Sequence, residues 1–207
     1  MKLEIILTAK EPELALAWEN YCNDIDFVSI HKGSILHVAC DAVVSPANSF
    51  GFMEGGIDQL YTDYFGPTLQ KKLQSMIKNK HSGELLVGHA EIIETGHQNI
   101  PYLIAAPTMR VPELLKKDSI NPYLAARAVL LLIKYGTFED GTPISKRVRT
   151  VAFPGLGTGV GQMNPDLCAK QVLAAIKRVV LNENHFPTSW KESVEQHKKL
   201  YTLEHTS

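Results

Sequence analysis

The sequence has few cysteines, no long apolar run and almost no net charge. Its three cysteines, Cys22, Cys40 and Cys168, are widely spaced, which argues against a CxxC metal pair and against a disulfide framework. No window approaches the roughly 18 consecutive apolar residues of a transmembrane helix. The start, MKLEIILTAKEPE, lacks the features of a signal peptide. We therefore expect a cytoplasmic protein that makes no membrane contact.

The chain also lacks a basic character and the common nucleotide and metal motifs. Its formal net charge is -1 at pH 7, so no overall positive field favours non-specific binding of nucleic acid. It has no Gly-Lys-Ser/Thr of a P-loop, and Val160 stands where a dinucleotide fingerprint needs glycine. The eight histidines form no HxxxH pair. We expect neither a metal nor a cofactor.

Short apolar runs alternate with amphipathic segments along the chain. This pattern predicts a three-layer α/β/α sandwich, in which helices cover both faces of a mixed, mostly parallel sheet. We expect one domain over residues 1–182 and a tail over 183–207. Strands are predicted within 2–8, 27–31, 41–45, 85–93 with a bend near Gly88, 102–106 and 149–153. Helices are predicted within 11–22, 57–65, 69–77, 122–136, 166–182 and 190–200, with Asn121 and Asn164 as N-caps and a polar connection at 136–147.

Two glycine-rich loops follow predicted strands and precede predicted helices. In parallel sheets such loops lie at the carboxyl ends of the strands, where ligands bind. The later loop, 154–164, places glycine at every second position from Gly155 to Gly161, with Thr158 in the middle. Glycines let backbone N–H groups point into one concavity beside a helix N-terminus, which suits a phosphate or a diphosphate. The alternative interpretation is a mobile turn chosen for its geometry alone.

The earlier loop, 45–58, contains candidate polar groups. Asn48 carries both a donor and an acceptor, which suits a sugar hydroxyl, or it forms an Asx-turn. Gly55 and Gly56 expose backbone N–H groups at a helix start. Asp58 lies in the first helical turn, where it is either a functional carboxylate or a favourable charge at the helix N-terminus.

Three motifs in order make the chain similar to the macro domain family. DAVVSPANSFGFMEGGIDQLYTDYFGP resembles the family's Asn-Ala-Ala-Asn and Gly-Gly-Val-Asp segment, and VAFPGLGTGVGQMNPDLCAK resembles its second loop. Between them, GELLVGHAEIIETGHQNIPYLIAAPTM resembles the family's Thr-Gly-x-Ala strand and the strand after it. The resemblance spans about residues 26–182.

The resemblance implies that the protein binds ADP-ribose or a related nucleotide diphosphate sugar, with an ADP-ribosylated protein as a further partner. By position, Asp58 would orient or activate a water at the anomeric carbon, and Asn48 would contact the distal ribose. The implied catalytic residues are Asn48 and Asp58. The implied ligand-binding residues are Ser34, Ile35, Ala47, Asn48, Gly55, Gly56, Ile57, Gly155, Leu156, Gly157, Thr158, Gly159, Val160, Gly161 and Met163.

The chain also departs from the family pattern. Ser34 stands where the family often has an aspartate that recognises adenine, Ser45 and Pro46 replace the start of Asn-Ala-Ala-Asn, and Met163 replaces an aromatic near the distal ribose. Phe52 brings an aromatic ring toward the ligand position.

We expect hydrolysis of an ADP-ribosyl ester or a related derivative. The alternatives are a non-catalytic binding module and an ADP-ribose 1″-phosphate phosphatase.

Overall fold

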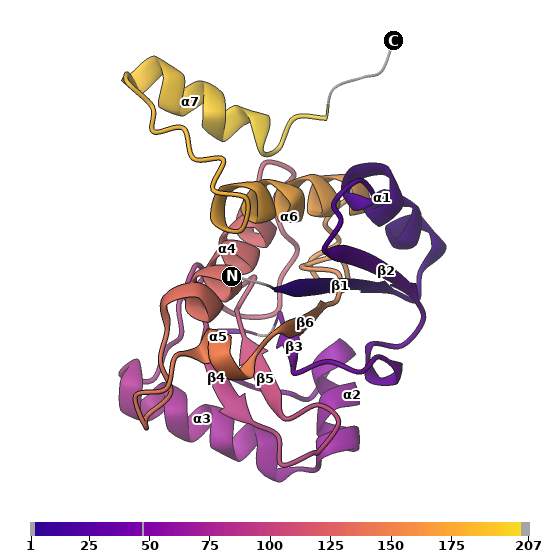
Figure 1. The fold of residues 1–207 in the computed structure, drawn as a ribbon, viewed down its shortest axis with the longest axis vertical. Coiled ribbons are helices and arrows are strands. Elements are labelled where there is room, and N and C mark those ends of the chain that lie inside the picture. The colour runs from indigo at the N-terminus through magenta and orange to yellow at the C-terminus, as the bar shows by residue number, and fades with distance from the viewer. Residues whose placement is uncertain (1–2, 47, 204–207) are drawn as a thin grey trace.

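A computed structural model describes residues 3–46 and 48–203 of the chain. Within them, six strands form one sheet in the order β2-β1-β6-β3-β5-β4 (Figure 1). All neighbouring pairs are parallel except β4 and β5, which are antiparallel. The strands are β1 (Glu4–Ala9), β2 (Val28–Lys32), β3 (Ala42–Ser45), β4 (Glu91–Glu94), β5 (Tyr102–Ala105) and β6 (Thr150–Phe153).

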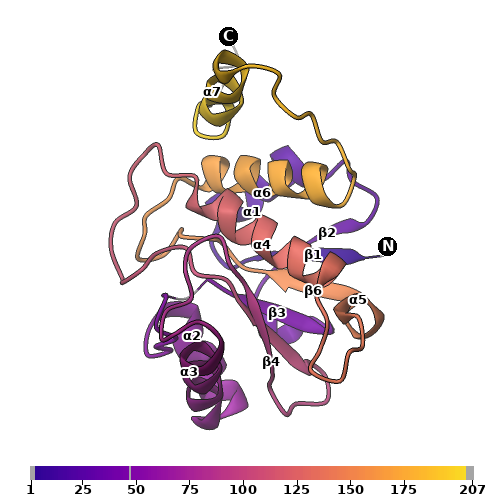
Figure 2. The ribbon, with the colours of Figure 1, turned by 90° about the vertical axis from the view of Figure 1, so that its left-hand side faces the viewer.

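Helices cover both faces of this sheet, which confirms the predicted three-layer sandwich (Figures 1 and 2). One face carries α1 (Pro12–Cys22), α4 (Asn121–Tyr135) and α6 (Pro165–Val179), and the other carries α2 (Gly56–Phe65) and α3 (Thr68–Lys80). In the described part of the chain, no helix combines the length and the apolar character needed to cross a bilayer.

Alternating strand residues fill the two cores. In β3, Val44 packs with the α1, α4 and α6 layer, whereas Val43 packs with the α2 and α3 layer. Successive side chains of a strand point to opposite faces, so a strand buried on both sides must be apolar throughout. Each fully buried valine or leucine stabilises the fold by about 1.5–3 kcal/mol. The sheet is thus held between two apolar layers, and the loops at its strand ends are not part of this core.

Three local predictions differ from the structure. Residues 85–87 form no strand, and β4 begins only at Glu91. The predicted polar connection at 136–147 contains a short helix, α5 (Ile144–Arg147). Asn121 is wrong as an N-cap because Ile120 holds that position, and the Asn121 side chain instead donates to the Thr108 carbonyl at 2.7 Å. Asn164 is confirmed as the N-cap of α6, because its Oδ1 accepts from the Leu167 amide at 3.1 Å.

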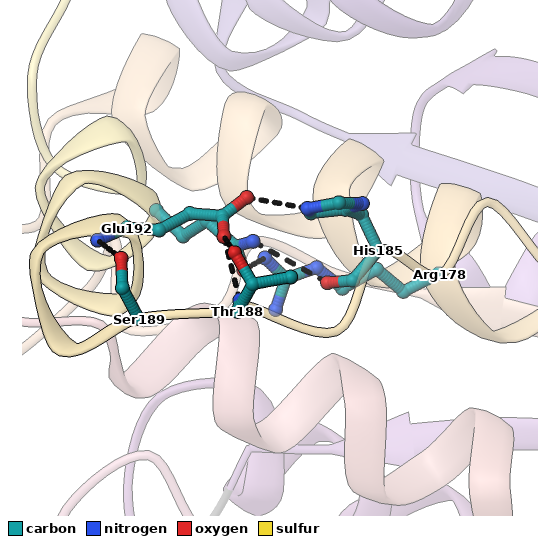
Figure 3. Close-up of polar contacts among 6 residues, drawn as sticks. Arg178, His185, Thr188, Ser189 and Glu192 are labelled. Carbon is teal, nitrogen blue, oxygen red and sulfur yellow. Dashed lines mark hydrogen bonds and ion pairs between the residues drawn. The ribbon is translucent and has the colours of Figure 1, made fainter.

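The segment after α6 folds over that helix and forms α7 (Trp190–Lys199), a helix with no buried residue. Its N-cap is Ser189, whose hydroxyl accepts from the Glu192 amide, and the Glu192 carboxylate accepts from the amide of the preceding residue, Thr188 (Figure 3). Glu192 also contacts His185. After the helix, Leu200 is buried against the core. The domain boundary at residue 182 stays a prediction.

Candidate functional site

A cavity of about 1260 Å³ opens at the carboxyl ends of the parallel strands. Its walls come from the segments that follow β1, β2, β3, β5 and β6, together with the first turns of three helices, α1, α2 and α6. Helix N-termini carry partial positive charge and unpaired N–H groups, so their convergence favours an anion. The two glycine-rich loops lie side by side in this cavity because β6 and β3 are neighbours in the sheet.

The later glycine loop has a defined shape. The Met163 amide donates to the Gly157 carbonyl at 3.0 Å, and the Gln162 amide donates to the Gly159 carbonyl at 3.0 Å. Gly157 adopts a φ of +71°, and a Cβ at Gly161 would lie 2.5 Å from the Gly157 carbonyl oxygen. Two glycines are therefore required by the backbone geometry of the loop.

The same loop offers unused donors. Within the described structure, the amides of residues 157–161 donate to no other group. All of these residues line the cavity. Successive free amides at a loop of this kind form an anion-binding concavity. This arrangement favours the anion-site interpretation over a turn that serves geometry alone.

Asp58 lines the same cavity from the first turn of α2. Its side chain is only 8% exposed, and burial raises its pKa to about 7, because a buried carboxylate loses its hydration. The Ser45 hydroxyl donates to Asp58 Oδ1 at 2.5 Å and opposes part of that rise. Ser45, at the end of β3, is therefore the partner of the carboxylate. In the sequence, Ser45 stands out only as a departure from the family pattern.

Asn48 lines the cavity, but its polar atoms serve the loop itself. Its Oδ1 accepts from the Phe50 amide at 3.1 Å and from the Phe52 amide at 3.3 Å, and its Nδ2 donates to the Phe52 carbonyl at 2.8 Å. This is the Asx-turn interpretation. The turn holds Phe52, which is 53% exposed, at the cavity, so Asn48 positions an aromatic side chain.

Most of the predicted site residues line this one cavity. Ser34 does not, because its hydroxyl caps the short helix η1 (Ile35–His37) by accepting from the Leu36 amide at 3.4 Å. Leu156 does not either, because it is fully buried and its amide donates to Cys168 Sγ. Ala47 lies outside the described residues. The predicted residues that do line the cavity are Ile35, Asn48, Gly55, Gly56, Ile57, Asp58, Gly155, Gly157, Thr158, Gly159, Val160, Gly161 and Met163.

Two segments of the cavity wall were missed from the sequence. Residues 8–14 comprise the end of β1 and the start of α1, and residues 108–112 follow β5 and pair with Asn48 through a bridge at Met109. Neither segment is rich in glycine. The signal that could have found them is topological, since both lie at the carboxyl ends of strands that run parallel to β3 and β6.

The family model of the macro domain matches residues 44–172. A macro domain-containing protein of Caldanaerobacter subterraneus is 30% identical over 64% of this chain and 69% of its own length. O-acetyl-ADP-ribose deacetylase 1 of Pantoea vagans is 25% identical over 74% of this chain and 82% of its own. A solved variant of the Oceanobacillus iheyensis macrodomain with ADPR superimposes with a TM-score of 0.58 and is 22% identical. The match covers 82% of this chain and 86% of that one, and this likeness supports the fold. The chain belongs to the macro domain family.

Proposed function

We propose that the cavity binds ADP-ribose and hydrolyses an ADP-ribosyl ester, with an ADP-ribosylated protein as the substrate. The observation that carries the proposal is a buried carboxylate, Asp58, with a pKa of about 7, in the same cavity as a loop of free amides. The name of the Pantoea vagans relative, a deacetylase of O-acetyl-ADP-ribose, supports ester hydrolysis on an ADP-ribose derivative. A cytoplasmic location stays a prediction.

In this mechanism the amides of residues 157–161 hold the diphosphate, and the distal ribose extends toward Asp58. Amide dipoles that are already oriented stabilise the bound charge without reorganising. A water forms a bond to the anomeric carbon while the bond from that carbon to the ester oxygen breaks. Asp58 accepts the proton of the water, and the acceptor leaves as a carboxylate. A general base is most effective when its pKa is near the working pH, and Asp58 meets this condition.

One observation favours a second candidate, the non-catalytic binding module. The hydrogen-bonding atoms of Asn48 are occupied by the 48–52 turn, so this side chain has less to offer a ribose than its position in the sequence indicates. In that case the cavity would bind ADP-ribose, and Asp58 would contribute to affinity only.

Calorimetric titration with ADP-ribose, followed by an assay for ADP-ribose release from an ester-modified protein, tests both candidates. The D58N variant keeps the size of the side chain and an acceptor for Ser45, so it is expected to bind ADP-ribose and to lose activity about 100-fold or more. The control is D63N, which removes an exposed carboxylate of the same helix that also lines the cavity, so it shows whether the loss of activity comes merely from a change in the charge of the lining. Binding without release by the wild type would establish the binding module, and no binding by the wild type would refute both candidates.

The pH dependence of release gives an independent test of the role of Asp58. A base must be ionised to act, so activity is expected to rise with pH and level off above about 7. For a group with this pKa, the ionised fraction increases about tenfold between pH 6 and pH 8. A rate that falls over this range would contradict the assignment of Asp58 as the base.

A further inference from the structure

The wall formed by residues 8–14 lies outside the segment that the family model matches, residues 44–172. It contributes Lys10, and among the described residues Lys10 is the only lysine or arginine that lines the cavity. The acidic residues that line the cavity are more numerous: Glu11, Glu13, Glu54, Asp58 and Asp63. The net charge of these side chains would therefore oppose an anionic ligand. Among the described residues, Lys10 is the one lining side chain whose positive charge could pair with such a ligand.

Lys10 is placed beside the loop of free amides. It follows Ala9, the last residue of β1, and β1 is the sheet neighbour of β6, from which that loop begins. The first turn of α1 abuts the loop, because a Cβ at Gly155 would lie 2.7 Å from Leu14 Cδ2. The Ala9 carbonyl accepts from the Gly33 amide at 2.8 Å, which ties the end of β1 to the end of β2. This segment is thus anchored on both sides of Lys10.

The side chain of Lys10 is free to meet a ligand. It is exposed, and it forms no ion pair or hydrogen bond with any residue in 3–46 or 48–203. Lys10 differs in this from Lys32, which is paired with Glu19 at 2.7 Å. An unpaired ammonium gives up no protein partner when it binds a phosphate.

We infer that Lys10 is the phosphate-binding side chain of the cavity and pairs with the diphosphate of the ligand. The inference rests on the proposed function. β1 and β3 lie on opposite sides of β6, so Lys10 approaches the diphosphate from the side away from Asp58, which follows β3. The amides of residues 157–161 contribute partial charges along one surface of the diphosphate, and Lys10 contributes a whole charge. Lys10 therefore favours charged nucleotides over uncharged nucleosides.

Calorimetry with ADP-ribose and with uncharged adenosine tests this inference on the full chain. K10Q is expected to weaken ADP-ribose binding about 1.5- to fivefold, the range typical of one exposed ion pair. Adenosine binding should be unchanged, and K10R should restore the affinity for ADP-ribose. K146Q is the control, because Lys146 is an exposed lysine on α5, which precedes β6 and so lies at the opposite end of the sheet from the cavity.

The ionic strength of the buffer supplies a second measurement. The difference between wild type and K10Q should shrink as salt rises from about 0.05 M to about 0.5 M, because salt screens exposed charges. ADP-ribose binding by the wild type with equal binding by K10Q would overturn the role of Lys10 and leave the proposed function intact. A wild type that does not bind ADP-ribose would overturn both.

Discussion

Replacing Asp58 by asparagine is expected to stabilise the folded protein at alkaline pH. Burial raises the pKa of Asp58 to about 7, compared with 3.8 for an exposed aspartate. The folded state therefore binds the proton more tightly than the unfolded chain does. Linkage then requires that the free energy of unfolding falls as pH rises between 3.8 and 7, and stays low above that range. The asparagine side chain of D58N is uncharged at every pH and avoids this loss.

The magnitude follows from the two pKa values. At about 1.4 kcal/mol per pH unit, the difference between 7 and 3.8 corresponds to about 4 kcal/mol. About 3 kcal/mol of this lies between pH 5 and pH 8, where most proteins can be studied without acid unfolding. Asparagine keeps an acceptor for the Ser45 hydroxyl, so the hydrogen bond that holds the side chain is retained.

Urea unfolding of wild type and D58N at several pH values between 5 and 8 provides the assay. The advantage of D58N should grow steadily from pH 5 and level off above about 7. The difference between wild type and the exposed-site control D63N should depend on pH far less. Parallel curves for wild type and D58N would refute the reasoning, because they would mean that folding does not change the protonation of Asp58.

Two further substitutions test the loops. G161A should lower the free energy of unfolding, measured by urea titration, by about 1–3 kcal/mol, because the new Cβ would lie 2.5 Å from the Gly157 carbonyl oxygen. In the control G159A the new Cβ meets nothing within 4 Å, so this variant should be nearly neutral in the same titration. N48A should lower it by about 1–3 kcal/mol through the loss of the three hydrogen bonds of the 48–52 turn. Unchanged stability in N48A would contradict a structural role for Asn48 in the turn and would favour a role in ligand binding alone.

The sequence by itself determined the layers of the fold and the two loops of the cavity. Apolar strands, helical spacing and turn residues are local signals, and they place Gly161 and Asp58 in loops that follow strands expected to run parallel. The carboxyl ends of such strands meet at one edge of the sheet, so the predicted topology is enough to bring the two loops together. The local Asn-Pro pattern predicted the N-cap Asn164 correctly, but it failed at Asn121, whose side chain donates to the distant Thr108 carbonyl.

The tertiary structure alone decided how the side chains are used. The pKa of Asp58 depends on burial by residues that are distant in the sequence, and Ser45 reaches it from the end of a strand. Asn48 could serve a sugar or a turn, and only the closure of the 48–52 loop settled its contacts. Lys10 carries no motif and enters the cavity because β1 is inserted beside β6, a long-range pairing that no local pattern encodes.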